Sequence, residues 1–382
     1  MRSALCSAVG IVFLAAVAMS ATGQEDRSNP SKTGERLFEK ETFGGNGRTC
    51  RTCHSEDTGT VSPQDAAKRL KKDPDDPLFV HDGSDDGLGH GHARMLADAT
   101  ILMTIPLPAN VTLADDPAAR TVILRRGIPT TLNTPALDPV LMLDGRQPTL
   151  EAQAAGAIRD HAQGVGPSAA DLHSIALFEL TEEFFSSPAL RHFARGGAAP
   201  GLPQGHTASE KRGRRFFEDQ PPDPAQGFRP GLCAHCHSGP LLNQTNQFAK
   251  DFIGLPILPG TRFMGILVSE FNAANNPVRE FVFNQGTADE SHVFSPDPGR
   301  ALITGIGNVP DPTLALENVN AFKISQLRGI RLTAPYFHDN SAKTLEDVAA
   351  HYARFFNVVT GGGLVLTADE QKDMVAYMKL LD

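Results

Sequence analysis

The sequence excludes several protein classes by what it lacks. Its 382 residues contain no tryptophan, three tyrosines and five cysteines. No apolar run reaches the ~20 residues that span a bilayer, which excludes a polytopic membrane protein. The net charge of −9 gives no basic footprint of the kind that nucleic-acid binding needs, so we expect no nucleic-acid partner. With 40% hydrophobic and 21% charged residues, the composition is that of a globular chain and not of a disordered one.

The first 23 residues have the features of an export signal. Arg2 supplies a positive charge, Gly10–Ala21 is an apolar run of 12 residues, and small residues precede a cleavage site after Gly23. Because the run is too short to span a bilayer, we expect cleavage and export to a bacterial periplasm, without a stable membrane span. An uncleaved anchor stays open as the alternative. Cys6 lies inside the signal, which leaves four cysteines in the mature chain.

These four cysteines lie in two identical Cys-x-x-Cys-His patterns, Cys50–His54 and Cys233–His237. This is the attachment pattern of c-type haem. Two thiols at this spacing reach the two vinyl groups on one porphyrin edge, and the following His lies beneath the iron as its proximal ligand. A Cys₄ zinc site and two disulfides are alternatives, but neither needs a His after each pair. We therefore predict two covalently bound haems c, held by Cys50, Cys53, Cys233 and Cys236, with the iron bound by His54 and His237.

The two motifs belong to halves that repeat each other. Asp144 precedes Thr149 by five residues, Asp339 precedes Thr344 by five, and Leu-Glu follows each threonine. The stretch Ala194–Gly205 is rich in glycine and proline and is typical of a linker. The repeat therefore predicts two haem domains, over residues 24–200 and 201–382.

Helix signals outnumber strand signals along the chain. Capping residues and apolar spacing predict helices over Thr33–Lys40 and Pro63–Lys72, and helices that begin after Thr149, Ser168, Thr344 and Thr367. The strand candidate is Arg279–Asn284. We therefore expect an all-α, mostly helical fold with long loops closed around the haems.

The two helices after Thr149 and Thr344 differ at a position that decides the chemistry of the iron. The apolar stripe of the second helix turns Tyr352 inward, and the equivalent residue of the first is Ala157. A phenol oxygen can ligate ferric iron and a methyl group cannot. If these helices cover the distal haem faces, Tyr352 closes one iron and the other stays open. The alternative is that Tyr352 is a core aromatic residue.

Two polar side chains are candidates for a role at the open iron. Gln153 lies on the buried stripe, where its amide needs a partner that a bound oxygen species could supply. His161 falls on the same stripe if the helix continues. The alternatives are a loop-capping role for Gln153 and a structural or surface role for His161.

Several of these segments resemble the bacterial di-haem cytochrome c peroxidase family. That family includes MauG, the methylamine-utilisation enzyme that matures a protein-derived quinone. The resemblance rests on the two haem motifs and on Leu332–Asp339 (LTAPYFHD), Leu143–Arg146 and Leu150–Ala154, and it covers most of the mature chain. It implies two tandem cytochrome c-like domains, with a peroxide-reactive haem in the first and an electron-transfer haem in the second.

The resemblance also assigns single residues by position. Tyr352 takes the axial position of the second haem, as in the MauG-type members, and Gln153 matches the distal Gln. The family's distal Glu falls at Gln163, which cannot accept a proton as a carboxylate can. The distal Pro falls at Ala157 and the inter-haem Trp at Leu143.

The resemblance further bears on cofactors and partners. A family calcium site between the haems would use Thr333 and Pro335, but its Asn falls at Gly127, which argues against calcium. The implied partners are hydrogen peroxide and a small electron-donor protein, a cytochrome c or a cupredoxin. Formation of a homodimer is left open.

We therefore predict a periplasmic di-haem cytochrome-c peroxidase, an oxidoreductase in which Gln153, His161 and Gln163 act on peroxide at the haem of His54. The runner-up is a MauG-like oxidase of a protein or an organic substrate, which an axial phenolate favours. A non-catalytic di-haem electron carrier is the third alternative. The missing Glu and Trp favour a carrier, whereas Ala157 opposes it because a carrier has no use for an open iron.

Overall fold

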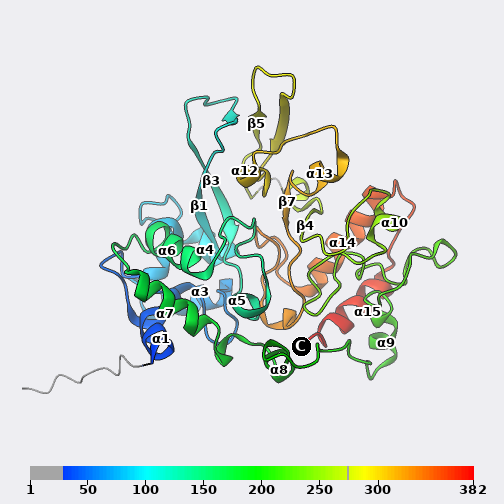
Figure 1. Cartoon of the computed structure of the whole chain (residues 1–382), viewed down its shortest axis with the longest axis horizontal. Coiled ribbons are helices and arrows are strands. Elements are labelled where there is room, and N and C mark those ends of the chain that lie inside the picture. The colour runs from blue at the N-terminus through cyan, green and yellow to red at the C-terminus, as the bar shows by residue number, and fades with distance from the viewer. Residues whose placement is uncertain (1–28, 273–274) are drawn as a thin grey trace, which may run out of the picture.

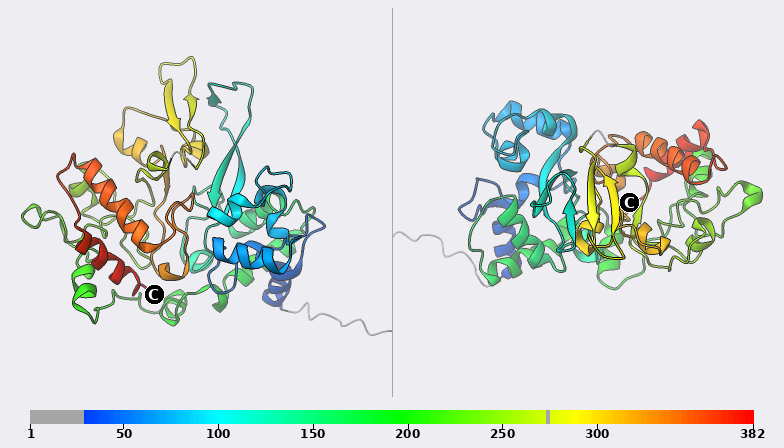
Figure 2. Two further views of the ribbon diagram at one scale, coloured as in Figure 1. Left: turned by 180° about the vertical axis from the view of Figure 1, so that it is seen from behind. Right: turned by 90° about the horizontal axis from the view of Figure 1, so that it is seen from above.

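The computed structural model describes residues 29–272 and 275–382. Figure 1 shows two groups of helices on opposite sides of a set of strands, and the views in Figure 2 agree. The α-helices of the first half are α1 (Pro30–Lys40), α2 (Cys50–Cys53), α3 (Pro63–Lys72), α4 (Ala93–Asp98), α5 (Thr134–Leu137), α6 (Leu150–Asp160), α7 (Ala169–Glu179) and α8 (Pro188–Ala194).

The second half continues with a similar series of mostly short helices. They are α9 (Ala208–Arg214), α10 (Ala249–Ile253), α11 (Val268–Phe271), α12 (Ala301–Thr304), α13 (Pro312–Leu316), α14 (Leu345–Val359) and α15 (Ala368–Met378). Short 3₁₀ turns lie between them and in the first half: η1 (Pro77–Phe79), η2 (His81–Gly83), η3 (Glu182–Phe184), η4 (Pro224–Gln226) and η5 (Ile330–Leu332).

The prediction of an all-α fold is wrong. Helix accounts for 37% of the structure and strand for 11%, and within residues 29–272 and 275–382 the strands form three antiparallel sheets. β1 (Thr100–Pro106) pairs with β3 (Thr121–Gly127), β4 (Phe263–Gly265) pairs with β7 (Ala321–Lys323), and β5 (Arg279–Phe283) lies between β2 (Val111–Leu113) and β6 (Ser291–Ser295).

The pattern of β3 explains why the sequence does not reveal this strand easily. Val122 and Leu124 point inward, as the alternation of a strand requires, but other positions do not follow the usual rule of apolar residues inside and polar residues outside. Ile123 is 60% exposed, whereas the charged Arg126 is 1% exposed. The β-branched residues of the strand were the remaining signal.

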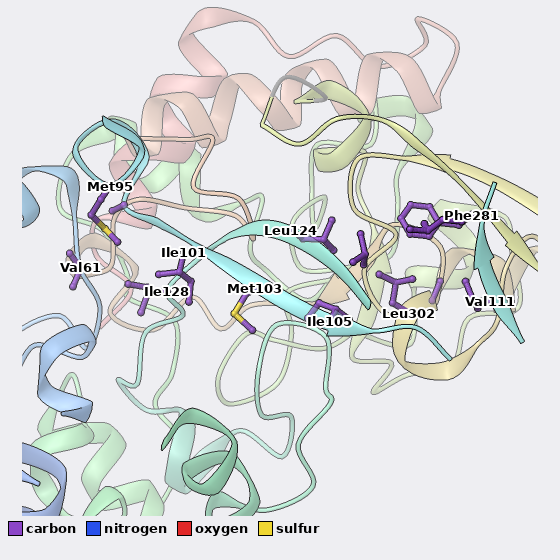
Figure 3. Close-up of a cluster of buried hydrophobic side chains, with 14 of the residues drawn as sticks. Val61, Met95, Ile101, Met103, Ile105, Val111, Leu124, Ile128, Phe281 and Leu302 are labelled. Carbon is purple, nitrogen blue, oxygen red and sulfur yellow. The ribbon is translucent and has the colours of Figure 1, made fainter. Parts of the chain in front are cut away.

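The strands join the two halves of the chain. β2 comes from the first half and pairs with β5 of the second, with Val111 opposite Phe283 and Leu113 opposite Phe281. Figure 3 shows the buried apolar cluster that follows β1 and β3 towards Phe281 and Leu302. The halves therefore share a hydrophobic core at the strands, and the domain division at residues 200 and 201 stays a prediction.

Away from the strands, the two halves repeat one helix packing. α1 crosses α7 at Gly34, where a Cβ would lie 1.9 Å from a carbonyl oxygen of α7. α9 crosses α15 at Gly213, where a Cβ would lie 2.0 Å from a carbonyl oxygen of α15. Each glycine is followed four residues later by a buried phenylalanine, Phe38 or Phe217. This common arrangement supports the predicted duplication.

Most of the predicted helices are confirmed. α3 has the predicted bounds, α1 contains the predicted Thr33–Lys40, and β5 coincides with the predicted strand to within one residue. Side chains of the four expected capping residues accept backbone hydrogen bonds at the starts of α6, α7, α14 and α15: Thr149, Ser168, Thr344 and Thr367. The predicted signal at residues 1–23 lies outside the described residues. Within them, no helix combines the length and apolarity needed to cross a bilayer.

Candidate functional site

Each Cys-x-x-Cys-His motif lines a cavity of its own. The N-terminal cavity is lined by the first motif together with β1, β3, α6 and α7, including Ile101, Met103, Ile128, Leu150, Ala154 and Ile175. The C-terminal cavity is lined by the second motif and α14, including Phe217, Leu232, Ile324, Leu327, Val348 and Phe356. Both walls are largely apolar, as the burial of a porphyrin requires.

A helical turn places the three functional residues of each motif on one side. The backbone N–H of His54 donates to the carbonyl of Cys50 at 3.0 Å, and that of His237 donates to Cys233 at 2.8 Å. Residues three and four positions apart share a helix face, so both thiols and the imidazole point to the same cavity. The spacing that predicts haem attachment is therefore matched by the local geometry.

The two motif histidines are held in the same way. Nδ1 of His54 lies 2.8 Å from the carbonyl oxygen of Gly59, and Nδ1 of His237 lies 2.9 Å from that of Leu242. A carbonyl can only accept, so Nδ1 carries the proton and Nε2 keeps its lone pair for a metal. Burial lowers the pKa of His54 to about 4 and also lowers that of His237, which keeps both rings neutral.

The cysteines fit thioether attachment better than the two alternatives. All four are free, and the two pairs line different cavities, so a single Cys₄ zinc site is excluded. Burial raises the pKa of Cys50 and of Cys236 to about 12. Among the described residues, no group of three or more His, Cys, Asp or Glu side chains is arranged to hold a metal ion.

The two cavities differ at the positions of Tyr352 and Ala157. The hydroxyl of Tyr352 on α14 lies 3.4 Å from Nε2 of His237, the atom that would bind iron. In the N-terminal cavity the equivalent wall residue is Ala157 on α6, and no described residue forms a hydrogen bond with Nε2 of His54. One motif histidine therefore lies beside a phenol, and the cavity of the other has a methyl group at the equivalent position.

The structure brings two of the three predicted catalytic residues to the N-terminal cavity. Gln153 and His161 line it together with His54. Gln163 does not: its side chain is exposed, its φ is +52°, and its amide oxygen accepts a hydrogen bond of 3.3 Å from Asn46. Only the first two are therefore placed to meet a ligand bound opposite His54.

Three further charged residues of this cavity region could not be singled out in the sequence. Nδ1 of His161 lies 2.6 Å from a carboxylate oxygen of Asp82, and Asp82 is paired with the buried Arg48. Glu179, at the end of α7, lines the cavity with 4% of its surface exposed, and its Oε2 has no hydrogen-bond partner among the described residues. A charged side chain inside an apolar cavity indicates a functional residue, but only the fold shows which charged residues lie there.

Glu179 gives a prediction about pH. Burial, with Glu151 second, raises its pKa to about 8. Between the ordinary carboxyl pKa and this value the folded protein binds the extra proton, so stability falls as the pH rises through that window. We expect Glu179→Gln to stabilise the haem-loaded protein by on the order of 4 kcal/mol at pH 9 and by less than about 1 kcal/mol at pH 5. Thermal unfolding of both proteins across pH 5–9 measures this, and parallel curves would contradict it.

The two cavities share one wall. Leu143 and Lys323 line both, and the backbone N–H of Lys323 donates to the carbonyl of Leu143 at 2.8 Å. Beside them, the Arg126 guanidinium lies 5.4 Å from the centre of the Phe322 ring, and Phe322 stacks on His338 at 3.7 Å. A short path of side chains therefore separates the two cavities at the position where the family's Trp falls.

The three residues of the implied calcium site also lie by these cavities. Thr333 and Pro335 line the C-terminal cavity, and Gly127 lines both. A Cβ at Gly127 would lie 2.1 Å from the side-chain oxygen of Asn340, so Asn340 fills the space that a side chain at position 127 would need.

Comparison with known proteins gives distant relatives. No family model matches the chain. The cytochrome-c peroxidase IdrP2 of Pseudomonas sp. (strain SCT) is 24% identical over 220 residues, and the cytochrome-c peroxidase IdrP1 of Denitromonas iodatirespirans is 26% identical over 165 residues. The matches cover 55% and 39% of this chain. They span 50% and 36% of the relatives, so half or more of each curated relative has no counterpart in the match.

Among solved structures, a MauG-like protein associated with microbial copper homeostasis is similar in fold. It has a TM-score of 0.50 and 18% identity, and the likeness covers 92% of this chain and 89% of the other. The shared fold agrees with the paired Cys-x-x-Cys-His motifs and with the cytochrome-c peroxidases among the relatives. The chain is therefore similar in sequence to cytochrome-c peroxidases over about half of its length and similar in fold to a MauG-like protein.

Proposed function

We propose that this protein is an exported di-haem peroxidase that reduces hydrogen peroxide with electrons from a small redox protein. The observation that carries the proposal is the asymmetry of the two cavities. Tyr352 faces Nε2 of His237, whereas the cavity of His54 offers the methyl group of Ala157 and two polar side chains. One cavity is suited to relay electrons and the other to bind a small molecule.

In this proposal each cavity holds one haem c. Cys50 and Cys53 form the thioethers of the first and Cys233 and Cys236 those of the second, while Nε2 of His54 and of His237 binds iron. When bound, the haems supply redox-active iron that exchanges single electrons and binds oxygen ligands. The neutral histidines and apolar walls of both cavities support this assignment.

The side chains of the N-terminal cavity would orient peroxide. The Gln153 amide can both donate to and accept from its oxygens. His161 can accept a proton from one oxygen and return it to the other, because an imidazole nitrogen can act as a general base and then as a general acid. The overall reaction takes up two electrons and two protons and converts hydrogen peroxide to two waters.

The shared wall supports electron transfer from the C-terminal to the N-terminal cavity. Leu143 and Lys323 border both cavities, so electrons would cross only a few side chains. A small cytochrome c or cupredoxin would deliver the electrons, one at a time. The predicted export signal would bring the protein to the periplasm, the compartment we propose for it.

A single-turnover experiment tests this function. The haem-loaded protein is fully reduced under anaerobic conditions and mixed with one equivalent of hydrogen peroxide. Because the reaction takes two electrons, we expect both haems to be oxidised by one peroxide. Haems that stay reduced would contradict the proposal.

Carbon monoxide binding separates an enzyme from an electron carrier. One haem of the reduced protein should bind carbon monoxide, and two inert haems would favour the carrier.

The position of Tyr352 favours a second candidate, a MauG-like oxidase of another protein or an organic substrate. Burial raises the pKa of this phenol far above its usual range, and a bound ferric ion would reverse that preference by favouring the phenolate. If Tyr352 held the iron as a phenolate, it would lower the potential of that haem and favour its higher oxidation states. Normal haem loading without peroxide-dependent oxidation of a small donor protein would favour this candidate.

Replacing Tyr352 tests its role as a ligand. We expect Tyr352→Phe to change the absorption and electron paramagnetic resonance spectra of the ferric C-terminal haem and to raise its potential by on the order of 100 mV. Tyr336→Phe is the matched control, because Tyr336 lines the same cavity but its hydroxyl donates to the carbonyl of Ile330 at 3.0 Å. An unchanged spectrum in Tyr352→Phe would overturn the assignment.

A further inference from the structure

The position of His161 raises the question of what fixes it. His161 follows the last residue of α6 and lines the N-terminal cavity, with 20% of its side chain exposed. Its Nδ1 lies 2.6 Å from Oδ2 of Asp82, which belongs to a 3₁₀ turn 79 residues earlier in the chain. Its Nε2 forms no hydrogen bond with any described residue. The ring is therefore held at Nδ1, whereas Nε2 keeps its hydrogen-bonding capacity for a ligand.

Asp82 determines which nitrogen of His161 carries the proton. Burial alone would raise the pKa of this carboxyl, but the hydrogen bond from His161 and the charge of Arg48 lower it, so Asp82 is ionised. An ionised carboxylate can only accept hydrogen bonds, so Nδ1 of His161 must donate. In the neutral ring the lone pair then lies on Nε2, the nitrogen that a base at this cavity would use.

Arg48 in turn fixes Asp82. Its side chain is 2% exposed and pairs with Oδ1 of Asp82. Its other N–H groups donate to the carbonyls of Pro77 at 2.8 Å, Leu78 at 2.9 Å and Val80 at 2.7 Å. Arg48 lies two residues before Cys50, so this network links the first haem motif to the segment that carries Asp82. Nearly all polar side-chain atoms of Arg48 and Asp82 form hydrogen bonds, which leaves Asp82 little freedom to move.

We infer that Asp82, held by Arg48, is a positioning residue that presents His161 as the proton acceptor and donor for peroxide in the N-terminal cavity. This inference rests on the proposed function and deepens it. Nε2 of His161 takes the proton from one peroxide oxygen and delivers it to the other, which leaves as water when the O–O bond breaks. The two electrons come from the donor protein through the haems. The pair would perform the proton transfer for which Gln163 has neither the chemistry nor the position.

The test compares single and double variants of the haem-loaded protein. We expect His161→Gln to lower the second-order rate with hydrogen peroxide by about 10²–10⁴-fold. Asp82→Asn should lower it by about 10²-fold, because an amide that donates to Nδ1 moves the proton to Nε2. The double variant should be no slower than His161→Gln, since Asp82 acts only through the ring. His173→Gln is the matched control: its ring is paired with Glu151 at 3.3 Å on the surface.

Cyanide binding gives a readout that does not depend on peroxide reduction. Hydrogen cyanide must lose its proton to bind ferric iron, so a base in the cavity accelerates its association. We expect association to slow at least tenfold in Asp82→Asn and His161→Gln and to stay unchanged in His173→Gln. If the cyanide association rates of the wild type and the variants follow this pattern but the wild-type protein does not reduce peroxide, the proposed function fails and the positioning role of Asp82 stands.

Two outcomes would overturn the inference. One is a rate in Asp82→Asn within threefold of the wild type for both peroxide and cyanide. The other is a double variant whose loss equals the product of the two single losses, because Asp82 would then act independently of His161.

Haem content and thermal midpoint are measured for each variant. If Asp82→Asn does not load its haem, Asp82→Glu takes its place: a carboxylate that still accepts from Nδ1 should keep most of the cyanide rate, and a rate as slow as that of His161→Gln would also overturn the inference.

Discussion

Replacing both Cys50 and Cys53 by serine is expected to leave one haem in the chain and to abolish peroxide reduction, with a loss of at least about 10³-fold. Serine cannot form the thioethers, and the cavity of these cysteines is the one that offers Gln153 and His161 to a ligand. Intact mass and a pyridine haemochrome assay count the haems, and mixing the reduced protein with peroxide measures the reaction.

The matched variant carries serine at Cys233 and Cys236 instead. It should also hold one haem, but that haem lies in the N-terminal cavity and should still bind carbon monoxide when reduced. Because the two variants have equal haem content, the comparison isolates the cavity that reacts. Two haems in either variant, or peroxide reduction that survives only in the first, would contradict the assignment of the cavities.

The second large effect concerns the buried cation between the two halves. Arg126 on β3 is 1% exposed; its Nε lies 2.7 Å from one carboxylate oxygen of Asp297, its Nη2 lies 2.9 Å from the other, and its Nη1 pairs with Asp144. The side chains of both acids are almost fully buried. Removing one partner of such a pair leaves uncompensated buried charge. We expect Arg126→Ala to lower the free energy of unfolding by about 3–5 kcal/mol.

Arg125→Ala is the control for this prediction. Arg125 is the neighbouring residue of the same strand, but its side chain is exposed, so its loss should change stability by no more than about 0.5 kcal/mol. Denaturant unfolding followed by circular dichroism compares the two variants. Equal effects in both, or a loss below about 1 kcal/mol in Arg126→Ala, would show that the buried pairing contributes little to holding the halves together.

Arg126 also shows why the fold class was mispredicted. Local patterns indicate an element when apolar residues follow its period, as in α6, α14 and α15. On β3 the inward position holds an arginine, because Asp297, 171 residues later in the chain, neutralises it there. The outward position holds Ile123. The alternation of this strand therefore depends on a distant partner, and the sequence signal was correspondingly weak.

The residues of the candidate site also fall into two groups, those that a local sequence pattern indicates and those that depend on distant partners. The motif histidines, the cysteines and Tyr352 line the two cavities, and a fixed spacing or an internal repeat selects each of them in the sequence. Asp82 and Arg48 could not be selected in this way, because they reach His161 from separate segments of the chain. The family resemblance selects Gln163 by position, yet the positive φ at this residue and the hydrogen bond from Asn46 place its side chain outside the cavity.

Steady-state turnover of hydrogen peroxide by the mature, haem-loaded protein is the direct test of the peroxidase proposal. A reduced small cytochrome c serves as donor, and its oxidation is followed with and without peroxide. We expect oxidation that depends on peroxide, with two donor molecules consumed per peroxide and loss of the reaction in the variant without Cys50 and Cys53. No turnover by a protein that carries both haems would contradict the peroxidase proposal and favour an oxidase of another substrate or an electron carrier.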